Sequence, residues 1–131
     1  MMVLFGDEAL LRAALDFEAA LARAAGAEGE IPVVAAEVII EVCRNAAFDI
    51  SELADEAAHA GTLAIPLVAE LRIRIAKTDP QAAKSLHKGG TSQDLADTAL
   101  MLQAKAGLAL IVRDADALRQ ALADLAGAVD E

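Results

Sequence analysis

Aromatic and basic residues are both scarce in this 131-residue sequence. It contains no tryptophan or tyrosine, aromatic residues fill 2% of its positions, and Lys and Arg total 11 against 21 Asp and Glu. Surfaces that bind nucleic acids combine a basic patch with stacking aromatic side chains. The formal net charge of −10 therefore argues against nucleic acid as a partner and favours a solubilising role for the acidic surface.

Cysteine, histidine and long apolar runs are also scarce. The single cysteine, Cys43, lies in the run VVAAEVIIEVCRNAAF, which predicts a small buried side chain in a reducing compartment rather than a nucleophile. One cysteine and two histidines are too few for a structural zinc site, so no metal is expected. No signal-peptide pattern is present, and no apolar run reaches the roughly 18 residues of a membrane span. These absences predict a cytoplasmic protein with no membrane partner.

Aliphatic residues dominate what is present. Hydrophobic residues fill 56% of the sequence, and the alanine and leucine among them favour helices over strands, which predicts an all-α fold. Capping and turn residues divide the chain into short helices. The first helix is predicted to have Asp7 as its N-cap, and Pro32 and Pro66 to open two others. Asp49 or Ser51 is predicted to cap a short helix between those two.

Apolar spacing predicts which helix faces are buried. In the first helix, which Gly26 and Gly29 are expected to end, the predicted stripe is Leu10, Ala14, Phe17 and Leu21. In the second helix, the predicted stripe is Val34, Val38, Val42 and Ala46.

A single long helix is predicted from Thr91 onward. No proline interrupts this part of the chain, so the helix should run for about 40 residues, far longer than an average helix. Its later part carries a heptad seam typical of helical bundles. The seam consists of Leu108, Ile111, Ala115, Leu118, Leu122, Leu125 and Val129. We expect other copies of the chain, or further sequence, to cover this seam.

Polar and flexible residues gather just before the long helix, in SLHKGGTSQDLADT. Thr91 and Asp94 match a capping box, and capping boxes are common enough that a purely structural role is the simpler interpretation. However, a helix N-terminus also attracts anions, two adjacent glycines leave the backbone uncovered, and His87 and Lys88 add donors. The segment therefore also fits a carboxylate-binding site.

Three segments in order carry a family resemblance. HKGGTSQDLADTALMLQ resembles the first conserved segment of the fumarase/aspartase superfamily, in which His-x-Gly-x-Thr-Ser-x-Asp precedes a long bundle helix. LDFEAALARA (residues 15–24) and AGTLAIPLVAEL (residues 60–71) agree with the 3-carboxy-cis,cis-muconate cycloisomerases within that superfamily. The resemblance implies an enzyme of protocatechuate breakdown in the β-ketoadipate pathway, which closes a γ-lactone without a metal or organic cofactor.

The resemblance also implies site residues. His87, Thr91 and Ser92 would contact a carboxylate of a small polycarboxylate substrate, Gln93 would lie beside the same pocket, and Thr62 would line a neighbouring part. None of these residues is expected to transfer a proton. His59, by contrast, is expected to meet the last carbonyls of its own short helix.

The second and third conserved segments of the family, a Gly-Arg-Thr with a downstream His and a Ser-Ser-x-Met-Pro-x-Lys loop, do not occur in the sequence. We therefore expect an N-terminal piece, inactive alone. It would comprise a small helical domain (1–90) and the first long helix of the central bundle (91–131), with assembly into a dimer or tetramer through that helix.

Two other interpretations stay open. One is a piece of an adenylosuccinate lyase-like enzyme, against which the segment AGTLAIPLV argues. The other is a non-catalytic helical oligomerisation domain.

Two positions also depart from the cycloisomerase pattern. The cycloisomerases usually have Asn at the position of Thr62 and Ala at the position of Gly90, so the substrate could differ.

Overall fold

The computed structural model describes residues 2–129, and it forms helices but no strand over this range. The all-α prediction is therefore confirmed. In chain order the elements are η1 (Met2–Phe5), α1 (Asp7–Ala27), α2 (Val33–Asn45), α3 (Ile50–Ala60), α4 (Ala64–Thr78), α5 (Ala82–Ser85) and α6 (Ser92–Val129).

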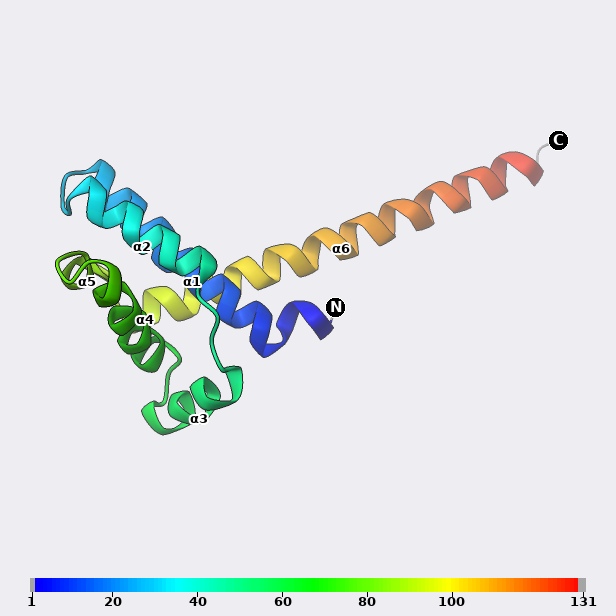
Figure 1. Ribbon diagram of the computed structural model, residues 1–131. Coiled ribbons are helices and arrows are strands. Elements are labelled where there is room, and N and C mark those ends of the chain that lie inside the picture. Colours follow the sequence, from blue (N-terminus) through cyan, green and yellow to red (C-terminus); the bar gives the residue numbers. More distant parts are fainter. Residues whose placement is uncertain (1, 130–131) are drawn as a thin grey trace.

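The helices form a small bundle from which one long helix projects (Figure 1). Helix α1 pairs with α2 on one side and packs along the first part of α6 on the other. Helices α4 and α5 pack against α2, and α3 packs mainly on α4. The core between them consists of aliphatic side chains, and its largest fully buried members include Ile39, Leu67, Leu71, Ile75 and Leu95.

The buried faces of α1 and α2 differ from the predicted stripes. In α1, Ala14 is buried as predicted, but the other predicted residues, Leu10, Phe17 and Leu21, are only partly buried. Leu11, Leu15 and Glu18 face the core in their place. In α2 the buried residues are Ala35, Ala36, Ile39 and Cys43, while Val34 is 65% exposed.

The buried face of α2 differs from the prediction because α1 and α2 pack closely against each other. A Cβ placed on Gly26 of α1 would lie only 2.9 Å from the Cβ of Ala36. Small residues must therefore occupy the contact, and larger valines are displaced to the flanks. Gly26 consequently serves helix contact rather than helix termination, and α1 ends one residue later at Ala27.

Several helix ends also differ slightly from the prediction. Gly6, not Asp7, is the N-cap of α1. Helix α4 begins at Ala64, two residues before Pro66, because the Thr62 hydroxyl accepts a hydrogen bond from the Ala64 N–H at 3.2 Å. The predicted cap of α3 is confirmed as Asp49, whose carboxylate accepts the N–H groups of residues 51 and 52.

Helix α6 confirms the predicted long helix, since it runs for 38 residues from Ser92 to Val129. Its buried positions recur every four residues in the first half only, at Leu95, Ala99, Gln103 and Gly107. The Gln103 side-chain amide donates to the Leu4 carbonyl at 2.8 Å and so fixes η1 against the helix. Beyond these positions α6 leaves the bundle (Figure 1). Its apolar side chains there are exposed.

Helix α6 also meets the length and composition of a membrane span, with 22% of its most apolar window buried. The sequence contains no uninterrupted apolar run of this length, because a few charged residues interrupt the apolar part of α6. Bundle helices of water-soluble proteins meet the same criterion, so the observation establishes only that α6 has a long apolar surface.

We expect Gly26→Ala to lower the free energy of unfolding by about 1–2 kcal/mol. Alanine favours a helix over glycine, but the added methyl group collides with Ala36 and overpacks the contact between α1 and α2. Gly127→Ala is the matched control, because its Cβ would point into open space in α6 and should raise stability by up to about 1 kcal/mol. Urea denaturation of both variants measures the difference. Equal stability of the two variants would contradict the close contact.

Candidate functional site

Four of the five predicted site residues lie together where α6 begins. His87 is half-buried in the turn after α5, and Thr91, Ser92 and Gln93 are exposed at the helix start. Thr62 lies in the turn between α3 and α4, and within residues 2–129 no hydrogen bond joins it to the other four. Its observed role is the start of α4.

The capping box at Thr91 and Asp94 forms as predicted. The Thr91 N–H and hydroxyl donate to Asp94 Oδ2 at 2.8 and 2.7 Å, and the Asp94 N–H donates to Thr91 Oγ1 at 3.2 Å. The hydrogen bonds from Thr91 hold the pKa of Asp94 below its ordinary value, since they stabilise its ionised form. Asp94 is therefore an ionised residue that serves the start of α6, in agreement with the predicted capping box.

The capping box leaves one hydroxyl at the helix start available to a ligand. Thr91 Oγ1 is both donor and acceptor within the box, and Gln93 Nε2 donates to Asp97 Oδ1 at 2.7 Å. The Ser92 hydroxyl, in contrast, makes no hydrogen bond in the part of the chain that the structure describes. Ser92 is thus the side chain of this segment best placed to meet an anion beside the unpaired N–H groups of the first turn.

His87 turns towards the interior instead of standing free at the helix start. Its backbone lies in the left-handed region (φ 61°), which an L-residue adopts at a cost. Its Nδ1 lies 2.6 Å from Glu18 Oε1, and its ring meets Phe17 edge-on with ring centres 6.4 Å apart. Only 17% of the His87 side chain remains exposed. The strained turn therefore positions the His87 ring against the buried carboxylate of Glu18.

Glu18 is the residue that sequence reasoning missed. Its side chain is fully buried, and its Oε2 has no hydrogen-bond partner among the described residues. Burial raises the pKa of Glu18, while the charge and hydrogen bond of His87, and the charge of Arg72 on α4, act in the opposite direction. A signal was available in the sequence, because Glu18 shares helical spacing with Leu11 and Leu15 and is the one carboxylate in that stripe.

The neighbours of His87 do not all face a ligand. Lys88 donates to the Glu30 carbonyl, so its charge is held against the turn between α1 and α2. A Cβ on Gly90 would lie 2.9 Å from the Leu21 side chain and 3.3 Å from His87 Cε1. Gly90 therefore lets the backbone pack against the ring, and only Gly89 (φ 80°) borders open space. The expectation that both glycines are uncovered was half right.

Cys43 behaves as predicted. It is fully buried, and burial together with the nearby Glu18 charge raises the pKa of its thiol to about 12. The thiol is thus protonated at neutral pH and is a packing residue rather than a nucleophile.

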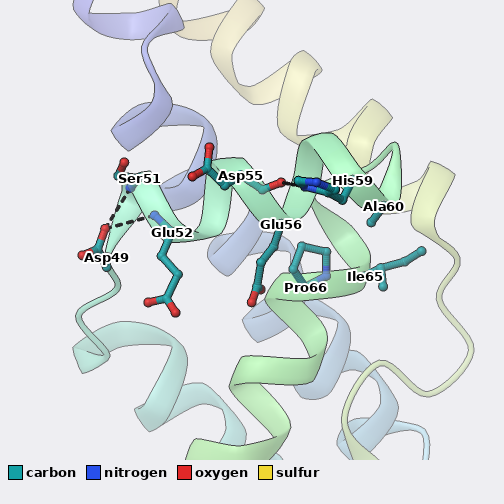
Figure 2. A pocket seen from close by; sticks show the side chains of 9 residues that line it. All are labelled: Asp49, Ser51, Glu52, Asp55, Glu56, His59, Ala60, Ile65 and Pro66. Atoms are coloured by element: carbon teal, nitrogen blue, oxygen red, sulfur yellow. Dashed lines mark hydrogen bonds between the residues drawn. The ribbon is translucent and has the colours of Figure 1, made fainter.

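A broad surface hollow lies elsewhere, over α3 and the start of α4 (Figure 2). It is shallow, measures about 870 Å³, and its lining is acidic, with Asp49, Glu52, Asp55 and Glu56 and with His59 as the one basic group. His59 Nδ1 lies 2.7 Å from the carbonyl of Asp55, one turn back in the middle of α3, so the predicted contact with the last carbonyls of its helix is not found among the described residues. Negative charge makes this hollow unsuited to a polycarboxylate. Across residues 2–129 no cluster of three or more possible metal ligands occurs.

Comparison with known proteins places this arrangement in a family. A family model described as Lyase matches residues 1–131. A 3-carboxy-cis,cis-muconate cycloisomerase of Bradyrhizobium diazoefficiens is 49% identical over 113 residues, which are 86% of this chain and 25% of that protein. A nitrosuccinate lyase of Streptomyces davaonensis is 38% identical over 120 residues, which are 92% of this chain and 25% of that protein.

A solved structure agrees with the sequence comparison. The chain superposes on the 3-carboxy-cis,cis-muconate lactonizing enzyme of Pseudomonas putida with a TM-score of 0.82 and 43% identity, over 86% of this chain and 26% of the other. The chain therefore spans about a quarter of the length of these relatives.

Proposed function

Since this chain belongs to the lyase family of the fumarase/aspartase superfamily, we propose that it is part of an enzyme that closes 3-carboxy-cis,cis-muconate to a γ-lactone. The observation that carries this proposal is the 49% identity with such a cycloisomerase over 86% of the chain. Within the enzyme, we propose that this segment binds a substrate carboxylate at the start of α6. The reaction belongs to the breakdown of protocatechuate in the β-ketoadipate pathway.

The chemistry of lactone closure fits a site built from fixed donors. One carboxylate of the substrate adds across a carbon–carbon double bond, so the other carboxylates must be held still while negative charge develops next to the bond. The start of α6 offers unpaired N–H groups, the Ser92 hydroxyl and the half-buried His87 ring. These groups bind and orient, and proton transfer is assigned to residues outside this segment. Lactone closure is an isomerisation and consumes no redox cofactor.

We further propose that the exposed part of α6 assembles with other copies in a cytoplasmic dimer or tetramer. Leu118, Leu122 and Leu125 are each more than half exposed along one stripe. Charged Arg113, Asp114, Asp116 and Arg119 interrupt the same region, and such charges are costly inside a bilayer. A helical protein partner therefore suits this surface better than lipid.

A second candidate is a lyase of a succinyl compound, favoured by the 38% identity with a nitrosuccinate lyase. The departures at Thr62 and Gly90 from the usual cycloisomerase pattern also leave room for it. Supplying the full-length parent enzyme with 3-carboxymuconate and, separately, with nitrosuccinate decides between the two candidates by which compound disappears. Turnover of neither would favour the non-catalytic oligomerisation domain.

For the carboxylate contact, we expect Ser92→Ala in the full-length parent to raise KM about tenfold, the effect of losing one hydrogen bond to a charged group. Stability should stay unchanged, because the hydroxyl makes no hydrogen bond within the described chain. Ser51→Ala, at the start of α3, is the matched control and should change neither KM nor Tm. Thr91→Ala should in addition cost about 0.5–2 kcal/mol of stability as the loss of a cap. If activity falls only in proportion to stability across these variants, the segment caps the helix and does not bind the substrate.

A further inference from the structure

We propose that Glu18 is a positioning residue for substrate binding: from the buried face of α1 its carboxylate holds the Nδ1 edge of His87, so that Nε2 is the ring nitrogen offered to a substrate carboxylate. This inference rests on the proposed function, because it adds to the same binding site a residue that the resemblance to the family did not point to.

The geometry of the pair fixes which ring nitrogen is engaged. Nδ1 of His87 lies 2.6 Å from Oε1 of Glu18, and an ionised carboxylate can only accept. Nδ1 must then carry a proton and donate it. In the part of the chain that the structure describes, no group hydrogen-bonds to Nε2. When the ring is cationic, Nε2 also carries a proton and can donate to an anion.

The surroundings leave the ring little freedom to rotate. Phe17 packs edge-on against it, and the backbone at Gly90 lies so close that a Cβ there would be 3.3 Å from Cε1. The left-handed backbone of His87 directs the side chain inward. A ring confined in this way keeps a fixed direction for its remaining nitrogen, which is the condition for orienting a bound anion.

Packing alone does not account for a carboxylate at position 18. The other buried side chains on this face of α1 are apolar, among them Leu11, Leu15 and Ala22. A buried acid without full hydrogen bonding costs stability, and Glu18 Oε2 has no partner among residues 2–129. An apolar residue at this position would stabilise the core more, so the carboxylate is best explained by its role in orienting the His87 ring.

The first test uses the 131-residue chain labelled with 15N-histidine. The sequence has only two histidines, so His59→Gln assigns the signals of His87. We expect the wild type to show a protonated, slowly exchanging Nδ1, and Glu18→Gln to lose this preference because an amide can donate as well as accept. Glu18→Asp keeps the charge at a shorter reach and should retain part of the signal. A wild-type His87 protonated on Nε2 alone, or identical ring signals in the wild type and Glu18→Gln, would overturn the proposal.

The second test measures kinetics in the full-length parent. Glu18→Gln should raise KM about tenfold and change kcat less, as expected for loss of one hydrogen bond to a charged group. Glu8→Gln, an exposed position on the same helix, is the matched control and should behave as wild type. An active parent whose KM is unchanged by Glu18→Gln would refute positioning by Glu18. A parent without turnover would instead refute the proposed function, while the ring signals would still decide the geometry of the pair.

Discussion

Replacing His87 with alanine should lower the free energy of unfolding by about 3–5 kcal/mol near pH 8, which is the usual cost of leaving a buried charge without its partner. The reason is the fully buried Glu18 side chain, whose Oε1 would lose its 2.6 Å contact while its Oε2 already lacks a partner among the described residues. An ionised carboxylate without a partner in the core is the source of the loss.

The deficit of this variant should depend on pH in a definite direction. Burial raises the pKa of Glu18 above its ordinary value of 4.5, and the charge and hydrogen bond of His87 oppose the rise, so their removal raises the pKa further. Between the ordinary and the raised pKa, the folded state binds a proton that the unfolded state releases, so stability falls as pH rises. Urea denaturation should therefore show a small deficit near pH 5 and a large one near pH 8.

Two controls isolate the buried charge. His59→Ala removes an exposed histidine whose one hydrogen bond among the described residues is with a backbone carbonyl, and it should cost little at any pH. His87→Ala combined with Glu18→Gln removes the charge together with its partner, and it should recover part of the stability and lose the pH dependence. A deficit of the single variant that stays constant between pH 5 and pH 8 would contradict the raised pKa of Glu18, because the carboxyl would then not titrate in this range.

The helices themselves could be predicted because their signals are local. Proline, glycine and capping residues mark most helix ends to within two residues, and the absence of proline after Thr91 predicts α6. The capping box at Thr91 and Asp94 also formed as predicted, since both partners lie within one helical turn.

The buried faces could not be predicted as well, because they depend on distant partners. An alanine-rich helix such as α1 offers several apolar stripes, and only the positions of α2 and α6 decide which stripe is covered. The predicted stripe left Glu18 near the edge, as a charged residue should be. Its actual place in the core is made possible by His87, 69 positions further along the chain, and no local pattern reveals that pairing.

The candidate site was predicted by resemblance more than by physics. The residues at the start of α6 stay a prediction as a binding site, and the sequence could not tell which of their groups are already engaged. The structure separates them: Thr91 is bonded to Asp94, His87 to Glu18, and the Ser92 hydroxyl is available. Thr62 stays a prediction as a substrate contact, since its observed bond serves the start of α4. The division into domains 1–90 and 91–131 also stays a prediction.

The other large effect is expected from Leu118→Lys in the exposed part of α6. Leu108, Leu118 and Leu125 are 60%, 61% and 64% exposed on one stripe, and burying each such side chain contributes roughly 1.5–3 kcal/mol. A symmetric interface contains each substitution at least twice, so losing about 2 kcal/mol per copy should weaken a dimer about a thousandfold. Sedimentation at micromolar concentration should show a wild-type oligomer and a 13.5 kDa monomer for the variant.

Dissociation should also unfold the projecting part of α6. Within residues 2–129 nothing else covers the helix beyond Leu110, and an isolated helical segment of this length is marginal in water. Amide exchange should therefore become fast over residues 108–129 in the variant but stay slow around Leu95, which is buried against the bundle. Gln120→Lys is the matched control, because it adds the same charge on the opposite face of the helix and should leave the oligomer intact. A wild-type chain that sediments as a monomer with slow exchange throughout α6 would contradict assembly through this stripe, because the helix would then be stable without a partner.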